Sequence, residues 1–338
     1  MTIEDVAAAA GVSRQTVSRA LNNMAEIKPE TRQRVLATIE RLDYRPNAFA
    51  RGMKTRKSNT IGLIVSDISN PFYPAVARGL FDAAETVGWN VVVYNTDLSR
   101  RREESALNEL IARGADGVVG FFYALDDATL ARYAGDLPMV VSDRPVDHAA
   151  LTSVTTDFGA GIRAAVEHLV ASGHQQIGML DSTVGVAADE RREAFVEQVP
   201  VALPAADLAG HVIQGPPTIP GGTAALHELL NARPEITAVV AFNDLMAIGA
   251  IHAARERGLA VPSELAVVGF DDLSIAPYVF PPLTTVHTDK YAHGRRLADV
   301  LHQLTAERTP DRYGERPAPS VSGSRVVLPA TLIVRESA

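Results

Sequence analysis

The chain has 338 residues, of which 46% are hydrophobic, enough for two or three domains that each bury a full core. It contains no cysteine, which excludes disulfides, thiol nucleophiles and cysteine-bound metals and suits a cytoplasmic protein. It has neither a signal-peptide pattern nor a run of about 18 apolar residues, so we expect no export and no association with a membrane.

The net charge of −8 is divided unevenly along the chain. Residues 1–58 carry 11 Lys and Arg against 6 Asp and Glu, a net charge of +5. The other 280 residues carry 21 basic and 34 acidic side chains, a net charge of −13. Because phosphate groups attract basic surfaces and repel acidic ones, we expect contact with a polyanion at the N-terminal segment alone.

Residues 2–22 form two short helical patterns joined by a glycine turn. Thr2 caps the first helix, and Asp5, three residues later, completes a capping-box-like pair. Gly11 ends this helix, because glycine adopts a left-handed C-cap at little cost. Ser13 caps the second helix. The residues expected to pack between the helices are small or apolar: Ile3, Val6, Ala7, Ala10, Val12, Val17, Ala20 and Leu21.

The outer face of the second helix is polar and suits nucleic acid. Its side chains hydrogen-bond base edges and phosphates readily. They are Arg14, Gln15, Thr16, Ser18, Arg19 and Asn22. The pattern predicts a helix-turn-helix, with one positioning helix and one recognition helix. The alternative is a pair of helices that belongs to an ordinary α-helical core.

A third helix over residues 30–42 would close a three-helix head, since Pro29 suits a helix start and Pro46 stops any continuation. Residues 45–59 follow, rich in charge. They contain a short potential helix, capped by Asn47, over residues 48–54. On composition alone this segment is a charged linker.

From Ile61 onward, short apolar runs alternate with amphipathic helices. Strands are expected at 61–65, 90–95, 117–122, 139–142, 176–180, 212–214, 238–242 and 265–270. Helices are expected at 74–87, 102–113, 127–134, 157–172, 189–198, 221–232, 244–257 and 290–306. This alternation predicts an α/β core with parallel, doubly wound sheets.

The alternation breaks in polar segments near residues 143–157 and 271–290, which indicates two lobes that exchange chain. Residues 283–289 and 325–334 would return to the lobes. Residues 306–324, with three prolines, would form an exposed connection.

Polar side chains follow several of the expected strands, where ligands bind in open α/β sheets. They are Asp67, Asn70, Asp143, Asn243, Asp244, Asp271 and Asp272. Phe72 and Tyr73 could stack on a ligand ring or anchor their loop to the core. Asp244 could instead cap the next helix, and Asp272 could form a turn.

No catalytic constellation emerges. The nine histidines are scattered without an H-x-x-x-H pair, and the chain has no P-loop and no G-x-S-x-G turn. Asp97, Glu103 and Glu104 are expected at solvated helix starts. We therefore expect no enzyme activity, no catalytic residue, no metal and no cofactor.

The segment TIEDVAAAAGVSRQTVSRALN resembles the N-terminus of the LacI/GalR family of bacterial transcription regulators. Four later segments are also similar to that family: DISNPFY, RREAF, FNDLMAIGA and GFDDLSIAPYVFPPLTTV. The resemblance implies a helix-turn-helix head, a hinge helix, and a two-lobed core built like periplasmic sugar-binding proteins. It implies domains at 1–46 (head), 47–59 (hinge), 60–158 with 290–318 (first lobe) and 159–286 with 320–338 (second lobe).

The resemblance also implies roles for individual residues. DNA contacts would come from Thr2, Ser13, Arg14, Gln15, Thr16, Ser18, Arg19, Asn22, Tyr44, Asn47, Arg51 and Met53. Arg51 and Met53 would act in the minor groove, and Met53 stands where the family usually has leucine. Ligand contacts would come from Phe72, Tyr73, Asp143, Arg191, Asn243 and Asp271. Arg191 matches the family pattern R-x-x-G-F, with Ala194 in place of the glycine.

The function implied is a DNA-binding repressor under allosteric control by a small carbohydrate. Because no leucine heptad follows the last strand, we expect a homodimer on a pseudo-palindromic operator. A nucleobase-type or other corepressor stays open as the effector. A sugar-binding transport protein and a sugar-metabolising enzyme are the alternative classes.

Overall fold

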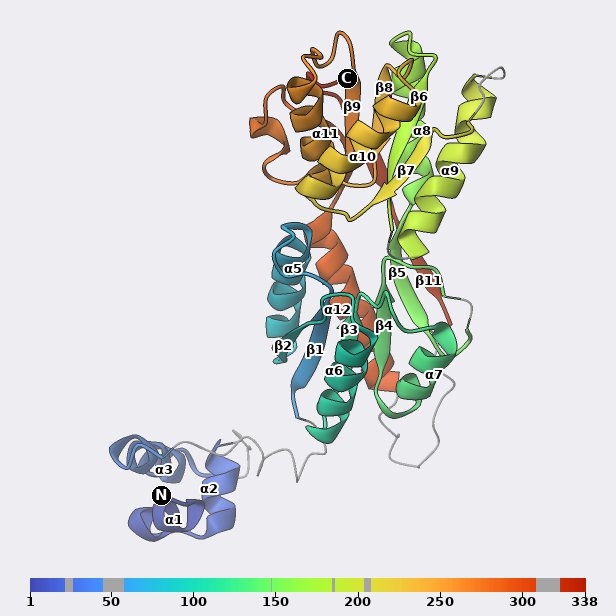
Figure 1. Ribbon diagram of the computed structural model, residues 1–338. Helices are drawn as coiled ribbons and strands as arrows, with labels where there is room; N and C mark the ends of the chain where they lie inside the picture. Colours follow the sequence, from blue (N-terminus) through green and yellow to red (C-terminus); the bar gives the residue numbers. More distant parts are fainter. Residues whose placement is uncertain (22–26, 45–57, 147, 184–185, 204–207, 308–322) are drawn as a thin grey trace. The chain divides into compact units, whose positions relative to one another are not determined.

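The structure is a computed structural model that describes residues 1–21, 27–44, 58–146, 148–183, 186–203, 208–307 and 323–338 (Figure 1). The chain divides into two units, Met1–Ser58 and Asn59–Ala338. We call the first unit the head and the second the core. Among the described residues, no helix is long and apolar enough to cross a membrane.

The head contains three described helices, α1 (Ile3–Ala10), α2 (Arg14–Leu21) and α3 (Pro29–Arg41). The capping box at the start of α1 is confirmed, because the amide and side chain of Thr2 both bond with Asp5. Gly11 adopts a left-handed conformation with φ 64° and donates to the carbonyls that α1 leaves open. The three helices bury a small common core of Val6, Ala7, Ala10, Val17, Ala20 and Val35. These local signals produce the helix-turn-helix predicted from the sequence.

The core contains two six-stranded sheets, one in each lobe (Figure 1). In the first sheet the strands lie in the order β11 (Arg325–Leu328), β5 (Thr152–Thr156), β4 (Met139–Ser142), β3 (Gly117–Gly120), β1 (Thr60–Val65) and β2 (Asn90–Asn95). In the second they lie in the order β12 (Ala330–Ile333), β10 (Thr284–Thr288), β9 (Ala266–Asp271), β8 (Ala238–Ala241), β6 (Ile177–Ser182) and β7 (Val212–Gly215). All pairs are parallel except β10 with β12.

Helices cover both faces of each sheet, so the doubly wound architecture is confirmed. The first lobe carries α5 (Phe72–Thr86), α6 (Arg100–Ala112), α7 (Asp127–Asp136) and α12 (Lys290–Glu307). The second carries α8 (Phe158–Ala171), α9 (Val186–Ala202), α10 (Ile219–Ala232) and α11 (Asp244–Glu256), with a 3-10 turn at Ala276–Tyr278.

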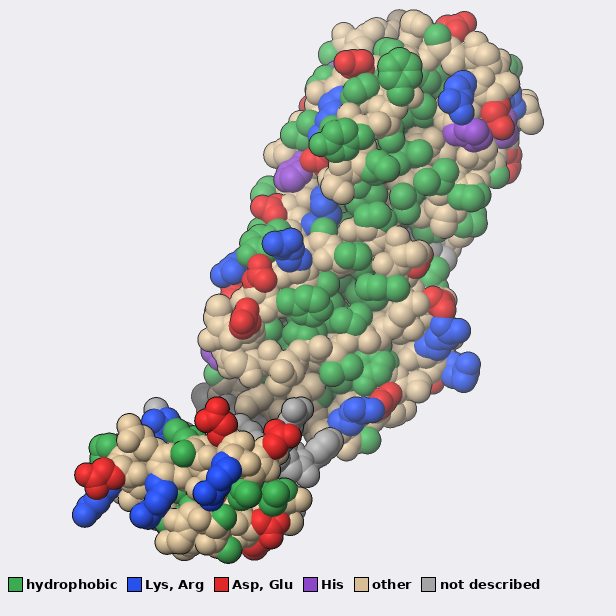
Figure 2. All heavy atoms as spheres, turned by 90° about the vertical axis from the view of Figure 1, so that its left-hand side faces the viewer, with side chains coloured by type: hydrophobic (Ala, Val, Ile, Leu, Met, Phe, Trp, Pro, Cys, Tyr) green, Lys and Arg blue, Asp and Glu red, His purple; other side chains and the backbone are tan. Residues whose placement is uncertain are grey.

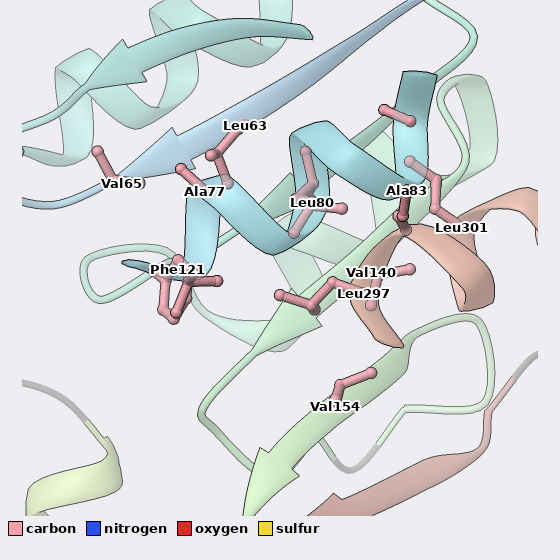
Figure 3. Close-up of a cluster of buried hydrophobic side chains, with 14 of the residues drawn as sticks. Leu63, Val65, Ala77, Leu80, Ala83, Phe121, Val140, Val154, Leu297 and Leu301 are labelled. Carbon is pink, nitrogen blue, oxygen red and sulfur yellow. The ribbon is translucent and has the colours of Figure 1, made fainter. Parts of the chain in front are cut away.

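Neighbouring residues of a strand point to opposite faces of the sheet. Leu63 of β1 packs under α5 and α12, whereas Ile64 packs on the other side with α6 and α7. Figure 3 shows the first of these clusters, in which Leu80 of α5 and Leu297 of α12 meet over the sheet. At Gly294 a Cβ atom would lie 1.9 Å from the carbonyl oxygen of Val76. This glycine therefore lets α12 approach the backbone of α5 closely.

One strand was missing from the sequence analysis, and one expectation about the lobes is wrong. Residues 143–157 are not simply a break, because they include β5, whose threonines and serine are fully buried in the sheet. Residues 320–338 do not all belong to the second lobe, because β11 pairs with β5 of the first lobe. Pro329 separates β11 from β12, so the chain changes lobe there. The lobes are therefore joined at three places: after β5, between β10 and α12, and at Pro329.

Candidate functional site

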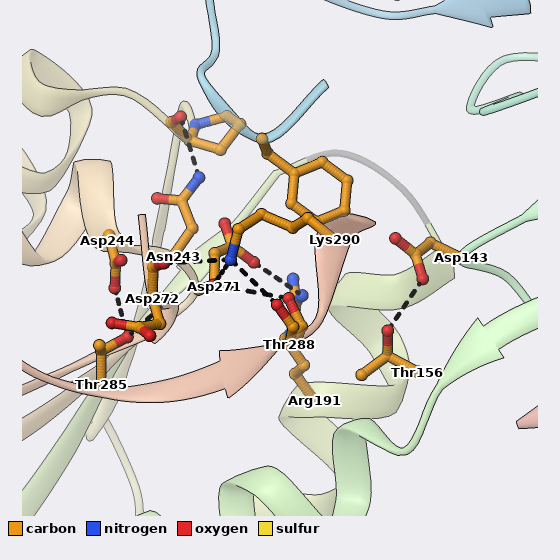
Figure 4. A network of polar contacts seen from close by, with 12 residues as sticks. Asp143, Thr156, Arg191, Asn243, Asp244, Asp271, Asp272, Thr285, Thr288 and Lys290 are labelled. Atoms are coloured by element: carbon orange, nitrogen blue, oxygen red, sulfur yellow. Dashed lines mark hydrogen bonds and ion pairs between the residues drawn. The ribbon is translucent and has the colours of Figure 1, made fainter. Parts of the chain in front are cut away.

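The polar residues that follow the strands meet at the boundary between the two lobes (Figure 4). Asp143 comes after β4 in the first lobe, whereas Arg191, Asn243 and Asp271 belong to the second. All four are buried. The carboxyl ends of the parallel strands bring them together, as expected for this class of sheet.

Arg191 lies in a cage of aromatic rings. Its guanidinium carbon is 4.3 Å from the ring centre of Phe158, 4.2 Å from that of Phe242 and 4.3 Å from that of Phe270. One terminal nitrogen is 3.9 Å from a carboxylate oxygen of Asp271, and its Nε is buried and donates no hydrogen bond. The rings attract the cation and exclude water from it. Sequence reasoning missed this cage, although Phe242 directly follows β8 and Phe270 lies within β9.

Asp271 and Asp272 form a strained turn at the end of β9. Their φ angles are 107° and 50°, in the left-handed region that residues with a side chain rarely occupy. The Lys290 ammonium donates to the carbonyl oxygens of Asp271, Asp272 and Thr288. Burial raises the pKa of the Asp271 carboxyl to about 7, against the opposing effects of Arg191 and Lys290.

Asp143 also has a left-handed backbone, with φ 50°. Its carboxylate accepts a hydrogen bond from the Thr156 hydroxyl at 3.2 Å. His293, buried at the start of α12, places Nδ1 3.8 Å from that carboxylate and Nε2 3.0 Å from the Ser142 hydroxyl. Thr156 and His293 were missed, because neither stands in a pattern that marks it.

Phe72 and Tyr73 are buried and pack edge-on against Phe121 in the core of the first lobe. Both rings therefore anchor their loop. The Tyr73 hydroxyl is bonded to the Ser66 hydroxyl at 2.6 Å and to the Tyr123 hydroxyl at 3.1 Å, and burial raises its pKa to about 12. It also lies within electrostatic range of the carboxylates on both lobes.

The start of α11 corrects one interpretation. Asn243, not Asp244, caps this helix, since the Asn243 side chain accepts from the Met246 amide at 2.9 Å. Asp244 is fully buried and accepts from the Thr285 hydroxyl at 2.5 Å and the Leu273 amide at 2.6 Å. Burial and the nearby Asp271 raise the pKa of Asp244 to about 8. Asp244 supports the turn that carries Asp271.

Glu103 is not at a solvated helix start, as the sequence had suggested. It is fully buried, and its carboxylate accepts from the backbone amides of Tyr123, Ala124 and Leu125. Arg144 holds the same loop from the other side by donating to the carbonyl of Leu125 at 2.8 Å. Long-range contacts of this kind leave no local signal in the sequence.

In the head, α2 exposes the residues predicted to contact bases. Arg14, Gln15 and Arg19 are exposed, while Thr16 and Ser18 are half-buried. Thr2 and Ser13 use their side chains as helix caps, and Tyr44 packs against the head core. Figure 2 shows Lys and Arg side chains on this unit. Four expected DNA contacts lie outside the described residues, together with the short helix expected at 48–54: Asn22, Asn47, Arg51 and Met53.

Two surface cavities lie outside the cluster of Asp143, Arg191, Asn243 and Asp271, and the second is lined by Thr156 and Phe158, which neighbour that cluster. One, of about 690 Å³, is at the far edge of the second lobe and is lined by His174, Thr237 and Arg257 among others. The other, of about 400 Å³, lies between α8, α9 and β11, where Glu190 and Arg325 form an ion pair of 2.9 Å between the lobes. Neither cavity is lined by the carboxylates or the caged arginine described above.

Comparison with known proteins identifies the class to which these two units belong. Residues 2–47 match the family described as bacterial regulatory proteins, lacI family, and residues 166–338 match a periplasmic binding protein-like domain. The transcriptional regulator GalS of Salmonella typhimurium is 38% identical over 288 residues, which cover 85% of this chain and 84% of GalS.

Solved structures of similar chains also belong to transcriptional regulators. The transcriptional regulator CelR in complex with cellobiose is 32% identical, with a TM-score of 0.73 and 100% coverage of both chains. The Lac repressor dimer bound to operator and an anti-inducer is 28% identical, with a TM-score of 0.85 and coverage of 100% of this chain and 98% of that one. These relatives are transcriptional regulators and not enzymes. The chain belongs to the LacI/GalR family of bacterial transcriptional regulators.

Proposed function

We propose that this regulator is a repressor that binds a pseudo-palindromic operator as a homodimer in the cytoplasm. A small carbohydrate held between the two lobes changes its affinity for that DNA. The observation that carries this proposal is the buried guanidinium of Arg191, whose Nε makes no hydrogen bond beside the carboxylate of Asp271. A buried donor without a partner is costly, so a ligand oxygen that accepts from it gains free energy.

The groups at the boundary suit a neutral polyhydroxy ligand. Asp143 and Asp271 offer carboxylate oxygens that accept from hydroxyls, and Arg191 donates to ring or hydroxyl oxygens. With Lys290, two cations face two carboxylates, so the site as a whole attracts neither a strong anion nor a strong cation. The CelR structure, with its cellobiose, supports a sugar of this kind.

Control of DNA binding follows from the position of the ligand. The ligand would contact both lobes and so favour one arrangement of the lobes over another. The arrangement of the lobes would in turn be coupled to the head through the chain that joins them. Coupling free energies of this type are about 1–3 kcal/mol. Operator affinity measured with and without the ligand gives the direction of the coupling: a ligand that weakens operator binding is an inducer, and one that strengthens it is a corepressor.

The test is a thermal-shift screen of the full chain with monosaccharides, disaccharides and nucleobases. A ligand at about 100 times its Kd stabilises the native state by about 2.7 kcal/mol. Arg191→Ala should abolish the shift by the active sugar and leave operator binding intact. Arg163→Ala, which removes an exposed arginine from α8 of the same lobe, should keep both properties. A variant at Arg191 that still responds to the sugar, or that loses DNA binding at normal stability, contradicts the assignment.

For the head, we propose that Arg14, Gln15 and Arg19 read bases in the major groove. Arg19→Ala should reduce discrimination between selected operator and random duplex by about 1–3 kcal/mol. Arg34→Ala removes the same charge from the exposed face of α3 and should leave the base preference unchanged. Fluorescence anisotropy across a salt series separates the two effects, because phosphate contacts change the salt slope. Equal loss of base preference in both variants would refute the role of Arg19.

The homodimer would form through an apolar face of the core. Figure 2 shows hydrophobic side chains spread over the side of the core where α5 and α11 lie in Figure 1. Among the exposed hydrophobic residues, Tyr278 is 84% and Phe280 is 91% exposed, both in the loop between β9 and β10. Exposed apolar surface of this kind marks protein interfaces. The operator-bound Lac repressor, described as a dimer, supports the same assembly here.

A further inference from the structure

The turn at Asp271 and Asp272 is held in place from a different lobe. Lys290 is the first residue of α12, which packs in the first lobe, whereas the turn ends β9 of the second lobe. Its ammonium donates to three carbonyl oxygens, of Asp271, of Asp272 at 3.0 Å and of Thr288 at 3.0 Å (Figure 4). One side chain thus uses all three of its donors on the carboxyl ends of two adjacent strands.

The backbone needs this support. Two consecutive left-handed residues, at φ 107° and 50°, persist in a protein only when their surroundings hold them. Other contacts hold the second residue: the carboxylate of Asp272 binds Arg335 at 2.7 Å and His287 at 2.9 Å. The backbone of the first residue is held by two donors to the Asp271 carbonyl oxygen, the Lys290 ammonium and, at 3.5 Å, the Thr288 hydroxyl.

Lys290 also changes the charge balance around that carboxylate. Burial favours the neutral form of Asp271 and raises its pKa to about 7, and the ammonium of Lys290 opposes this effect. The charged and titratable groups near the carboxylate come from five parts of the core: Arg191, Lys290, Asp143, Asp244 and Tyr73. Arg191 is fixed in its aromatic cage and the other three cannot add positive charge. Lys290 is therefore the second of the two cations that favour the ionised form of Asp271 against the effect of burial.

We propose that Lys290 is a positioning residue of the effector site, which holds the strained turn and, together with Arg191, places positive charge beside the Asp271 carboxylate. The role of Asp271 toward the effector rests on the proposed function above. The contact between Lys290 and the turn does not. Lys290 acts through Asp271 and makes no contact with the effector itself.

The first test uses no effector. The full chain, labelled with 13C at aspartate carboxyl carbons, is titrated by NMR, and the Asp271 signal is assigned from its loss in Asp271→Asn. Lys290→Met, which keeps length and removes charge, should raise the midpoint of the Asp271 titration by about one pH unit. Lys290→Arg keeps the charge and should leave the midpoint near that of the unaltered chain. If Lys290→Met titrates at the unaltered midpoint, or if both variants shift it equally, the proposal is overturned.

The second test measures affinity for the sugar found in the thermal-shift screen, from pH 5.5 to 9. If the ionised carboxylate binds the sugar, raising the pKa of Asp271 by one unit from about 7 lowers the affinity for the sugar. The loss is about fivefold at pH 7 and about tenfold at lower pH. Lys290→Met should show this loss, and Lys290→Arg should not. In the Asp271→Asn background, Lys290→Met should have no further pH-dependent effect. A screen in which no sugar binds contradicts the carbohydrate proposal, while the NMR titration decides on Lys290 independently.

Discussion

Asp244→Asn is expected to remove a large part of the pH dependence of stability. Asp244 is fully buried in the second lobe and bonded to the Thr285 hydroxyl and the Leu273 amide. Asparagine has the shape of the protonated acid: its oxygen accepts from the amide and its nitrogen donates to the hydroxyl oxygen. The substitution therefore keeps both contacts and removes the titration.

The magnitude follows from the pKa values in the two states. The pKa of Asp244 is about 8 when folded, against the ordinary value of 3.8 for an aspartate in the unfolded chain. Between these values the folded state binds one more proton than the unfolded state, so stability falls as pH rises. The slope is about 1.4 kcal/mol per pH unit, or about 3 kcal/mol between pH 5.5 and 7.5. Below about pH 4 and above about pH 8 the contribution is flat.

The assay is urea denaturation of the unaltered chain and the variant at half-unit intervals from pH 5.5 to 8.5. The difference in free energy of unfolding should grow with pH in favour of Asp244→Asn, because other titrating groups are common to both proteins. Asp299→Asn, at an exposed position on α12, should give a profile parallel to that of the unaltered chain. Parallel profiles for Asp244→Asn as well would refute the argument that burial holds this carboxyl protonated.

The remaining predictions concern the first lobe and the dimer. Glu103→Ala should destabilise the protein by about 3–6 kcal/mol, because three backbone amides at 123–125 lose their acceptor at about 1–2 kcal/mol each. Glu104→Ala, which removes an exposed ion pair with Arg100, should change the unfolding free energy in urea by less than about 1 kcal/mol, and equal effects would contradict the buried role of Glu103. Phe280→Ser should weaken dimerisation at least about tenfold in sedimentation equilibrium, since interface aromatics carry much of the binding energy. A dimer of unchanged affinity would place the interface elsewhere.

Features that depend on near neighbours in the chain could be predicted from the sequence. The Thr2–Asp5 capping box and the left-handed Gly11 were expected and are present, since each contact spans only a few residues. The places of Asp143 and Asp271 beside the lobe boundary were also expected, because a parallel sheet puts the carboxyl ends of its strands at one edge. Whether these residues bind the effector stays a prediction.

Features that depend on distant parts of the chain were missed. The strand β5 is polar in composition, yet it is buried, because it lies between β4 and β11, and β11 comes from a distant segment near the C-terminus. Glu103 lies in a highly charged helix start, where its sequence surroundings do not distinguish it from its partly exposed neighbour Glu104. Lys290 stands at the start of a helix, and nothing near it in the chain shows that its ammonium reaches β9.

The sequence by itself determined the head, the alternation of the core and the family, because periodicity, caps and contiguous motifs are local properties. The tertiary structure alone decided which lobe receives β11, how three phenylalanines enclose Arg191, and what holds the turn at Asp271. These contacts join residues that are tens to hundreds of positions apart, and burial then sets their charge. A carboxylate in water and the same carboxylate among Arg191 and Lys290 have identical neighbours in the chain but different pKa values.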